Sequence, residues 1–356
     1  MIGQINELLT IVGLGTILGL VLLLPFSVRW VEEELEAFLL VMGSLAVTVS
    51  GLWSRHLIAE ALLEPVKISF AVLVFGFVFR AIRDAIRKNV ARFAEKIGLK
   101  TFLFLLVAGL GFFSSVITAI IAALVLAEVI TGLSIDRDNE RKVVIIACYA
   151  IGLGAVLTPI GEPLATIATA KLAGPPYHAD FLFLARLLWP WVAAGVLGLG
   201  LLAGVYIGRK VSPAQSLVED KPENIKDIIV RAGKVYAFVA ALVLLGQGFG
   251  PLVDRYLIHW PAAALYWVNI LSAVLDNATL AAAEISPKMD LAKIEFLLLG
   301  LLISGGMLIP GNIPNIIAAS KLGIKSRDWA KFAVPLGFAL LFVYFGILQT
   351  VAGSAE

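Results

Sequence analysis

Long apolar runs without a single Asp, Glu, Lys or Arg recur along the whole chain, and they decide which solvent it can fold in. The clearest are residues 8–28, 37–54, 187–208, 235–253, 296–320 and 332–355. A membrane-spanning helix needs about 20 mostly apolar residues. With 60% hydrophobic residues, 15% charged residues and a mean hydropathy of +0.95, a water-soluble domain of this length could not cover its apolar surface. The runs therefore predict an all-α polytopic protein of the lipid bilayer.

Lys and Arg gather in connectors between these runs, and their distribution predicts the topology. The basic connectors are residues 80–100, 135–142, 209–234 and 325–331. By the positive-inside rule they face the cytoplasm. This holds only if the stretches 101–131 and 256–285 are re-entrant hairpins that return to the side they entered. We therefore expect about eight spanning helices, two hairpins and both termini outside, in a multi-pass protein of the inner (plasma) membrane.

Several function classes find no support in the sequence. The one cysteine, Cys148, lies in an apolar run, so no disulfide framework or cysteine metal site is expected. No phosphate-binding loop, nucleophile elbow or metal-ligand spacing occurs, so we expect neither an enzyme nor ATP-driven transport, and no resident cofactor. The net charge of +2 gives no reason to expect a nucleic-acid partner. The first 30 residues lack the basic start and cleavage site of a signal peptide, and are interpreted as a retained helix.

The chain repeats itself at an interval of roughly 150 residues. Residues 161–172 (GEPLATIATAKL) align with residues 311–322 (GNIPNIIAASKL), and five of the twelve positions are identical. Upstream, residues 114–123 align with 272–281, and the order of elements is the same in both halves. Each half crosses the membrane an odd number of times, so the second repeat is inverted relative to the first. Inverted repeats with interrupted helices are typical of secondary transporters.

This repeat divides the chain into regions. They are N-terminal spanning helices (1–58), a first repeat (59–208) with its hairpin (101–131) and broken helix (143–172), a cytoplasmic linker (209–232), and a second repeat (233–356) with its hairpin (256–285) and broken helix (294–322).

Proline and glycine interrupt one apolar helix in each half, at residues 158–163 (TPIGEP) and 309–315 (IPGNIPN). Proline removes a helix hydrogen bond and suits the first turn of a restarted helix. A broken helix leaves carbonyl groups without partners at one end and N–H groups without partners at the other. Such carbonyls can replace the water shell of Na⁺. The hairpin tips are expected to approach these breaks from opposite faces of the membrane.

Two carboxylates, Glu162 and Asp276, lie at these interruptions. An ionisable group at membrane depth is costly and points to function. Burial favours its protonated form and bound Na⁺ favours the carboxylate, and this competition is the chemical basis of proton–cation exchange. The remaining candidate Na⁺ ligands are neutral oxygen-bearing residues: Asn277, Thr158, Asn312, Asn315, Thr118 and Ser115. The alternative is structural: each carboxylate caps a half-helix, or the polar residues only join helices.

Other polar residues are interpreted as structural. Glu128 and Glu284 fall near the hairpin ends, and Lys171 and Lys321 match across the repeat near helix ends, where lysines usually reach toward the interface.

The two motifs give a family resemblance. Residues 158–163 are similar to the Ser-Pro-Ile-Gly-Asp motif of NhaD-type sodium/proton antiporters, and residues 272–279 (SAVLDNAT) to their Ser-Ala-x-x-Asp-Asn segment. Over residues 60–352 the chain resembles the ion transporter superfamily, closest to its predicted cation transporters. The resemblance implies two inverted repeats and often a homodimer. It places Glu162 at the motif's Asp, and Asp276 with Asn277 at the Asp-Asn pair.

The resemblance has departures, because the first hairpin reads Ser-Ser-Val-Ile-Thr, without an acid or Asn, and the antiporters usually have more helices. The first hypothesis is a Na⁺/H⁺ (monovalent cation/proton) antiporter that works by alternating access. The alternative is a sodium-coupled symporter of a small carboxylate or inorganic anion. Two carboxylates near the site would repel an anion unless Na⁺ neutralised them, which favours cation exchange. A membrane scaffold without transport would not need symmetric breaks.

Overall fold

The computed structural model describes the chain except residues 1, 134, 208–223, 253–259, 276 and 354–356. The described residues form helices and no strand, which confirms the all-α class. Five helices are long and apolar enough to cross a membrane: Arg55–Val78, Leu99–Ile117, Phe183–Val205, Ile225–Gly250 and Ser326–Val351. Shorter apolar helices accompany them. By the length and composition of its helices, the chain is a multi-pass membrane protein.

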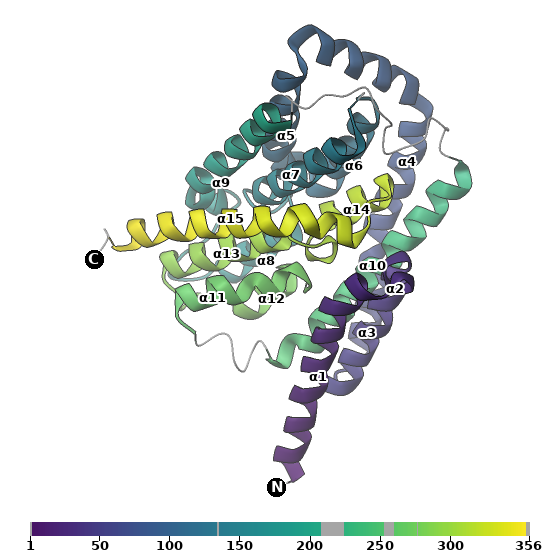
Figure 1. The fold of residues 1–356 in the computed structure, drawn as a ribbon. Coiled ribbons are helices and arrows are strands. Elements are labelled where there is room, and N and C mark those ends of the chain that lie inside the picture. Colours follow the sequence, from purple (N-terminus) through teal and green to yellow (C-terminus); the bar gives the residue numbers. More distant parts are fainter. Residues whose placement is uncertain (1, 134, 208–223, 253–259, 276, 354–356) are drawn as a thin grey trace.

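Figure 1 shows how the described helices are arranged. In chain order they are α1 (Ile2–Ser27), α2 (Arg29–Glu33), α3 (Leu35–Ser50), α4 (Arg55–Ile97), α5 (Leu99–Ile117), α6 (Ala119–Thr131), α7 (Arg137–Ala155), α8 (Pro163–Lys171), α9 (Phe183–Leu202), the π-helix η1 (Ala203–Ile207), α10 (Ile225–Leu252), α11 (Ala262–Val268), the 3₁₀ helix η3 (Asn269–Ala273), α12 (Asn277–Glu284), α13 (Leu291–Gly305), the 3₁₀ helix η4 (Ile309–Gly311), α14 (Ile313–Leu322) and α15 (Ser326–Gly353).

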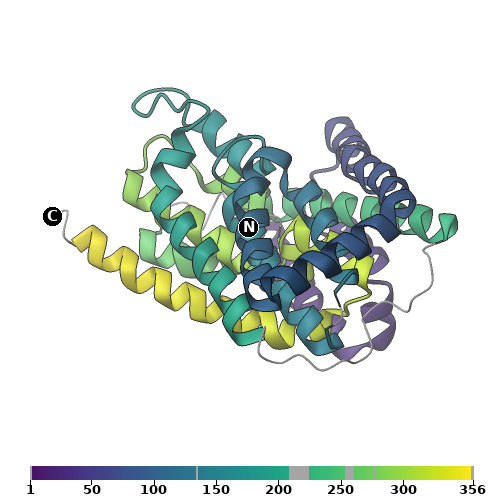
Figure 2. The ribbon, with the colours of Figure 1, turned by 90° about the horizontal axis from the view of Figure 1, so that it is seen from above.

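The helices gather into two groups. In the first, which we call the scaffold group, α10 packs against α3 and α4, and α1 packs against α3. Figures 1 and 2 show this group along one side of the molecule. In the second, the core group, α5, α7 and α9 pack together, and α13 packs against α7, α11 and α15. The groups meet where α4 contacts α6, and where α10 contacts α12 and α14.

The stretch predicted as the first hairpin folds into α5 and α6, which meet at Thr118. This residue has a left-handed φ of 74°, which ends α5 and turns the chain. Gly98 and Leu99, at the start of α5, line the same surface cavity as Gly132 and Leu133 after α6. The two ends of the stretch therefore lie together, so α6 runs back along α5.

The second stretch begins with α11 and η3 and ends with α12. Asn269 at the start of η3 is a polar neighbour of Glu284 at the end of α12. The two arms therefore face each other on either side of residue 276.

Both helices that were expected to break do so. α7 and α8 are separated by the non-helical residues 156–162, and α13 and α14 by residues 306–312, which include the single turn η4. Both helices begin earlier than the predicted stretches, at Arg137 and Leu291, because Asp136 and Asp290 cap their first turns.

The second half-helix of each broken helix packs against the hairpin of the other half of the chain. α8 packs against α12, and α14 packs against α6. The two halves are thereby interlocked, and the two breaks are held within one core.

Ion pairs join segments of the chain that lie far apart in the sequence. Arg141 pairs with Asp328 at 3.5 Å, and Lys234 pairs with Glu34 at 3.2 Å. Away from these, the Tyr177 hydroxyl donates to the Met289 carbonyl. Part of the predicted linker, 209–232, lies outside the described residues, and its last residues form the start of α10, which begins at Ile225.

Candidate functional site

The first hairpin tip is hydrogen-bonded to the first break. The backbone N–H of Ala119 donates to the Gly161 carbonyl at 2.9 Å. The Thr158 hydroxyl donates to the Ser115 carbonyl, and the Thr118 hydroxyl accepts from the N–H of Ile121 at 3.3 Å. Three of the predicted site residues, Ser115, Thr118 and Thr158, are thus brought together at one point in the core.

The second tip approaches the second break in the same way. A Cβ on Gly311 would lie 2.7 Å from the Ser272 carbonyl oxygen and 3.0 Å from the Cα of Ala273. Only glycine allows the two backbones to lie this close. The tip residue Asp276, the other predicted carboxylate, lies outside the described residues.

Hydrogen bonds at matching positions join each hairpin to its broken helix. Ser114 donates to the Ile151 carbonyl at 3.0 Å, and Ser272 donates to the Leu301 carbonyl at 3.2 Å. Ser114 aligns with Ser272, and Ile151 aligns with Leu301 at the offset of the motif that begins at Gly161. Both serine side chains are completely buried.

Glu162 and Asn312 occupy the same position in the two breaks. Each is the residue before a half-helix, with φ/ψ of −156°/160° for Glu162 and −155°/147° for Asn312. Their exposed fractions are 6% and 5%. Neither side chain makes a capping hydrogen bond to its helix, although both occupy the capping position. Glu162 nevertheless holds the position before α8, so the alternative in which its charge favours the helix N-terminus stays a prediction.

The second break lies across α7, close to where α7 ends at the first break. A Cβ on Gly152 would lie 2.9 Å from Asn312 Nδ2, and the Cys148 thiol lies 3.7 Å from the Pro314 carbonyl oxygen. Residues from both halves of the chain thus surround one region at the middle of the core.

Asn315 braces the second break, while Asn277 begins α12. The Asn315 amide donates to the carbonyls of Gly305 and Leu308, at 2.8 and 2.9 Å, and the Leu308 carbonyl also accepts the Gly311 N–H at 3.2 Å. Asn315 Oδ1 makes no hydrogen bond with a described residue. Asn277 is 4% exposed, and its Nδ2 likewise has no described partner.

The chemistry available at the breaks suits a hard monovalent cation. The described residues contain no group of three or more His, Cys, Asp or Glu that could hold a metal ion. A cation would instead meet carbonyl, hydroxyl and amide oxygens and the Glu162 carboxylate. Oxygen ligands of this kind favour Na⁺ over transition metals.

Sequence reasoning missed several buried polar residues. Asn269 and Ser304 are 1% and 0% exposed and face the core of the second half, and Glu140 is fully buried at the start of α7. Asn269 and Ser304 each lie in a stretch that reads as apolar. Glu140 was assigned to a charged connector, where nothing in the sequence separates a buried acid from solvated neighbours. Glu128 and Glu284 are also buried in protein.

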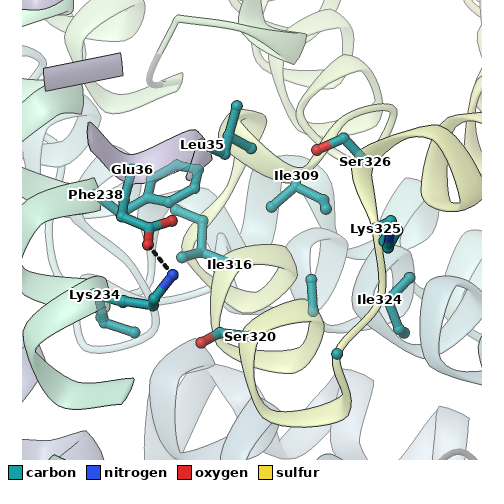
Figure 3. Close-up of a pocket in the computed structure, with 13 residues that line it drawn as sticks. Leu35, Glu36, Lys234, Phe238, Ile309, Ile316, Ser320, Ile324, Lys325 and Ser326 are labelled. Atoms are coloured by element: carbon teal, nitrogen blue, oxygen red, sulfur yellow. Dashed lines mark ion pairs between the residues drawn. The ribbon is translucent and has the colours of Figure 1, made fainter. Parts of the chain in front are cut away.

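A cavity of about 300 Å³ lies between the scaffold group and the second break. One wall comes from α3 and α10, where Lys234 forms an ion pair with Glu36, and the other from η4, α14 and the start of α15 (Figure 3). Ile309 and Ile316, which belong to the break and to α14, line it. The cavity therefore borders the second break on the side that faces α3 and α10.

Comparison with known proteins adds a family without an assigned function. No curated protein matches the chain significantly. The family profile described as "Protein of unknown function (DUF1646)" matches residues 11–351, which is nearly the whole chain. The chain with the paired breaks described above is therefore a member of the DUF1646 family.

Proposed function

We propose that this protein is a secondary active transporter, a sodium/proton (monovalent cation/proton) antiporter that works by alternating access. The observation that carries the proposal is the pair of helix breaks with buried polar residues, Glu162 and Asn312, at the same position in each. Broken helices at the membrane midplane are where secondary transporters bind their ions.

The exchange follows from a carboxylate that holds either a proton or Na⁺. In a buried site the protonated form of Glu162 is neutral and needs no counter-ion. Na⁺ binding replaces the proton and adds carbonyl and hydroxyl ligands. The proposed ligand set is completed by Asp276, Asn277, Thr158, Asn312, Asn315, Thr118 and Ser115. The site releases its proton or its Na⁺ to one side of the membrane at a time. It changes sides when the core group moves relative to the scaffold group.

Two observations support alternating access. The equivalent hydrogen bonds of Ser114 and Ser272 support two inverted repeats, and hence about eight spanning helices with two hairpins. The cavity beside Lys234 supports an opening toward one side of the membrane, the cytoplasmic side in the proposed topology. The proposal includes the inner membrane, termini outside and, from the family resemblance, a homodimer.

The test is proton efflux from acid-loaded proteoliposomes that contain the purified protein, with Na⁺, Li⁺, K⁺ or no cation added. We expect cation-dependent loss of the pH gradient in the wild type. Glu162→Gln and Asp276→Asn are each expected to reduce it to the level of protein-free liposomes. Glu64→Gln, at an exposed position, is the matched control and should keep full activity.

Thermal unfolding in detergent checks that the purified protein is folded. If folded protein responds to none of the cations, the antiport proposal is overturned. Sodium-driven uptake of small carboxylates or inorganic oxyanions would then assign the protein as a symporter. Normal antiport in Glu162→Gln would remove that residue from the ligand set.

A further inference from the structure

The buried carboxylates of the two hairpins have different charged and polar groups around them. In the first half, Glu128 of α6 is 4% exposed and its Oε2 lies 2.9 Å from the Lys321 ammonium of α14. The guanidinium of Arg231, from α10, also acts electrostatically on Glu128. Glu128 is therefore compensated by positive charge from two other helices.

The equivalent lysine of the first half does not reach the buried carboxylate of the second hairpin. Lys171 of α8 aligns with Lys321, but its ammonium donates to the main-chain carbonyls of Ala282 and Ile285 at the end of α12. Between those residues lies Glu284, which is 1% exposed. Neither carboxylate oxygen of Glu284 makes a hydrogen bond with a described residue.

Other helices that pack on α12 bring no compensating charge to it. The charged residues of α10 all lie in its first ten residues, and residues 235–252 have none. On α13, Glu295 is hydrogen-bonded to Trp191 of α9, and Lys293 lies in the first turn, where its backbone N–H is capped by Asp290. The polar neighbour of Glu284 is the Asn269 amide of η3, whose Nδ2 donates to the Leu297 carbonyl and whose Oδ1 has no described partner.

A buried carboxylate with no ion pair, and with only the Asn269 amide beside it, is far less stable than its neutral form. We propose that Glu284 is a proton-binding site of the second hairpin, protonated in this conformation, with the Asn269 amide oxygen as the acceptor for its hydroxyl. Glu284 lies eight residues after Asp276 on the same hairpin. In the proposed antiporter it would hold a proton between the hairpin tip and the connector beside Tyr177, and this role in transport rests on the proposed function.

The experiment is infrared difference spectroscopy of the purified protein in lipid at neutral pH, in the region of the protonated carboxyl C=O stretch. We expect Glu284→Gln to remove one such band and Asn269→Ala to shift it. Glu128→Gln is the matched control and should leave the band in place, because Glu128 forms an ion pair with Lys321. If breaking that ion pair prevents folding, Glu128→Gln/Lys321→Gln removes both charges together and serves instead.

An unchanged spectrum in folded Glu284→Gln protein would overturn the inference. A band that appears only when Na⁺ is removed would also overturn it, because Glu284 would then bind a cation. The proteoliposome assay separates the two proposals. If the band is present but no cation is exchanged, the proton site stands and antiport fails, whereas antiport without the band leaves antiport standing and removes the site.

Discussion

One glycine in each break allows the chain to fold back on the helix that precedes the break. A Cβ on Gly161 would lie 1.9 Å from the Ala155 carbonyl oxygen, and one on Gly311 would lie 2.5 Å from the Gly305 carbonyl oxygen. These two glycines are aligned in the repeat, and so are the residues whose carbonyls they approach. The contact is therefore a property of the break itself, made once in each half.

A single methyl group tests this closeness. We expect Gly161→Ala to destabilise the protein by roughly 1–3 kcal/mol, because the crowding atoms belong to the backbone and cannot rotate away. It should also lower the transport rate by displacing Glu162. Gly198→Ala, in α9 with open space around it, is the control. Equal unfolding temperatures for the two variants in detergent would contradict the prediction.

At this scale the sequence predicts the residues that interrupt a pattern. Glu162, Thr158 and Asn312 were found because proline and glycine mark the breaks beside them. Asn269, and the different partners of Glu128 and Glu284, could not be found, because they depend on which helices pack together. Burial by distant elements leaves no local signal in the chain.

At the scale of elements, the second break is held by one side chain. α13 ends at Gly305, and the break leaves carbonyls at residues 305 and 308 that the Asn315 amide binds from the first turn of α14. The first half has Ala165 at the aligned position, which has no side-chain amide. The two breaks therefore share a backbone path but differ in how they are braced.

Removal of that amide should loosen the second break. We expect Asn315→Ala to cost about 1–3 kcal/mol, since the Gly305 carbonyl loses the amide donor and the Leu308 carbonyl keeps only the backbone N–H of Gly311. Ser320→Ala, at an exposed position of the same helix, is the control and should be neutral. Thermal unfolding in detergent compares them, and a stability equal to that of the control would show that water or a rearranged backbone satisfies the carbonyls.

Apolar runs and breaks predict elements well, because the bilayer requires each spanning segment to satisfy its own backbone. Their ends are predicted less well. α10 begins inside the stretch that reads as a charged linker, since charged residues are compatible with a helix outside the hydrocarbon. η3 interrupts the second hairpin without proline or glycine, so no local sequence signal predicts it.

For the whole molecule, the arrangement predicts which connectors share a side of the membrane. The Tyr177–Met289 hydrogen bond joins two connectors that are poor in Lys and Arg, and the Arg141–Asp328 pair joins two that are rich in them. The hydropathy of the helices does not decide this. It follows from the proposed topology, in which each hairpin returns to the side that it entered.

Cysteine labelling in sealed vesicles tests this arrangement. Gly174→Cys and Lys288→Cys should react with a membrane-impermeant thiol reagent from one side, and Lys88→Cys and Lys325→Cys from the other. Wild-type protein is the control, because Cys148 is 2% exposed and should not react. Labelling of positions 174 and 288 from opposite sides would show that a hairpin crosses the membrane.

The packing of α8 on α12 and of α14 on α6 has a consequence for how the chain is made. The ribosome delivers α5 and α6 long before α14, so Glu128 enters the membrane before Lys321 exists to meet it. The first half therefore cannot complete its packing at the translocon by itself. The surfaces of α6 and α8 that α14 and α12 cover need protection until synthesis of the second half is nearly complete. Final assembly is therefore a late step of biogenesis, and two halves produced as separate polypeptides would have to find each other within the membrane before quality control removed them.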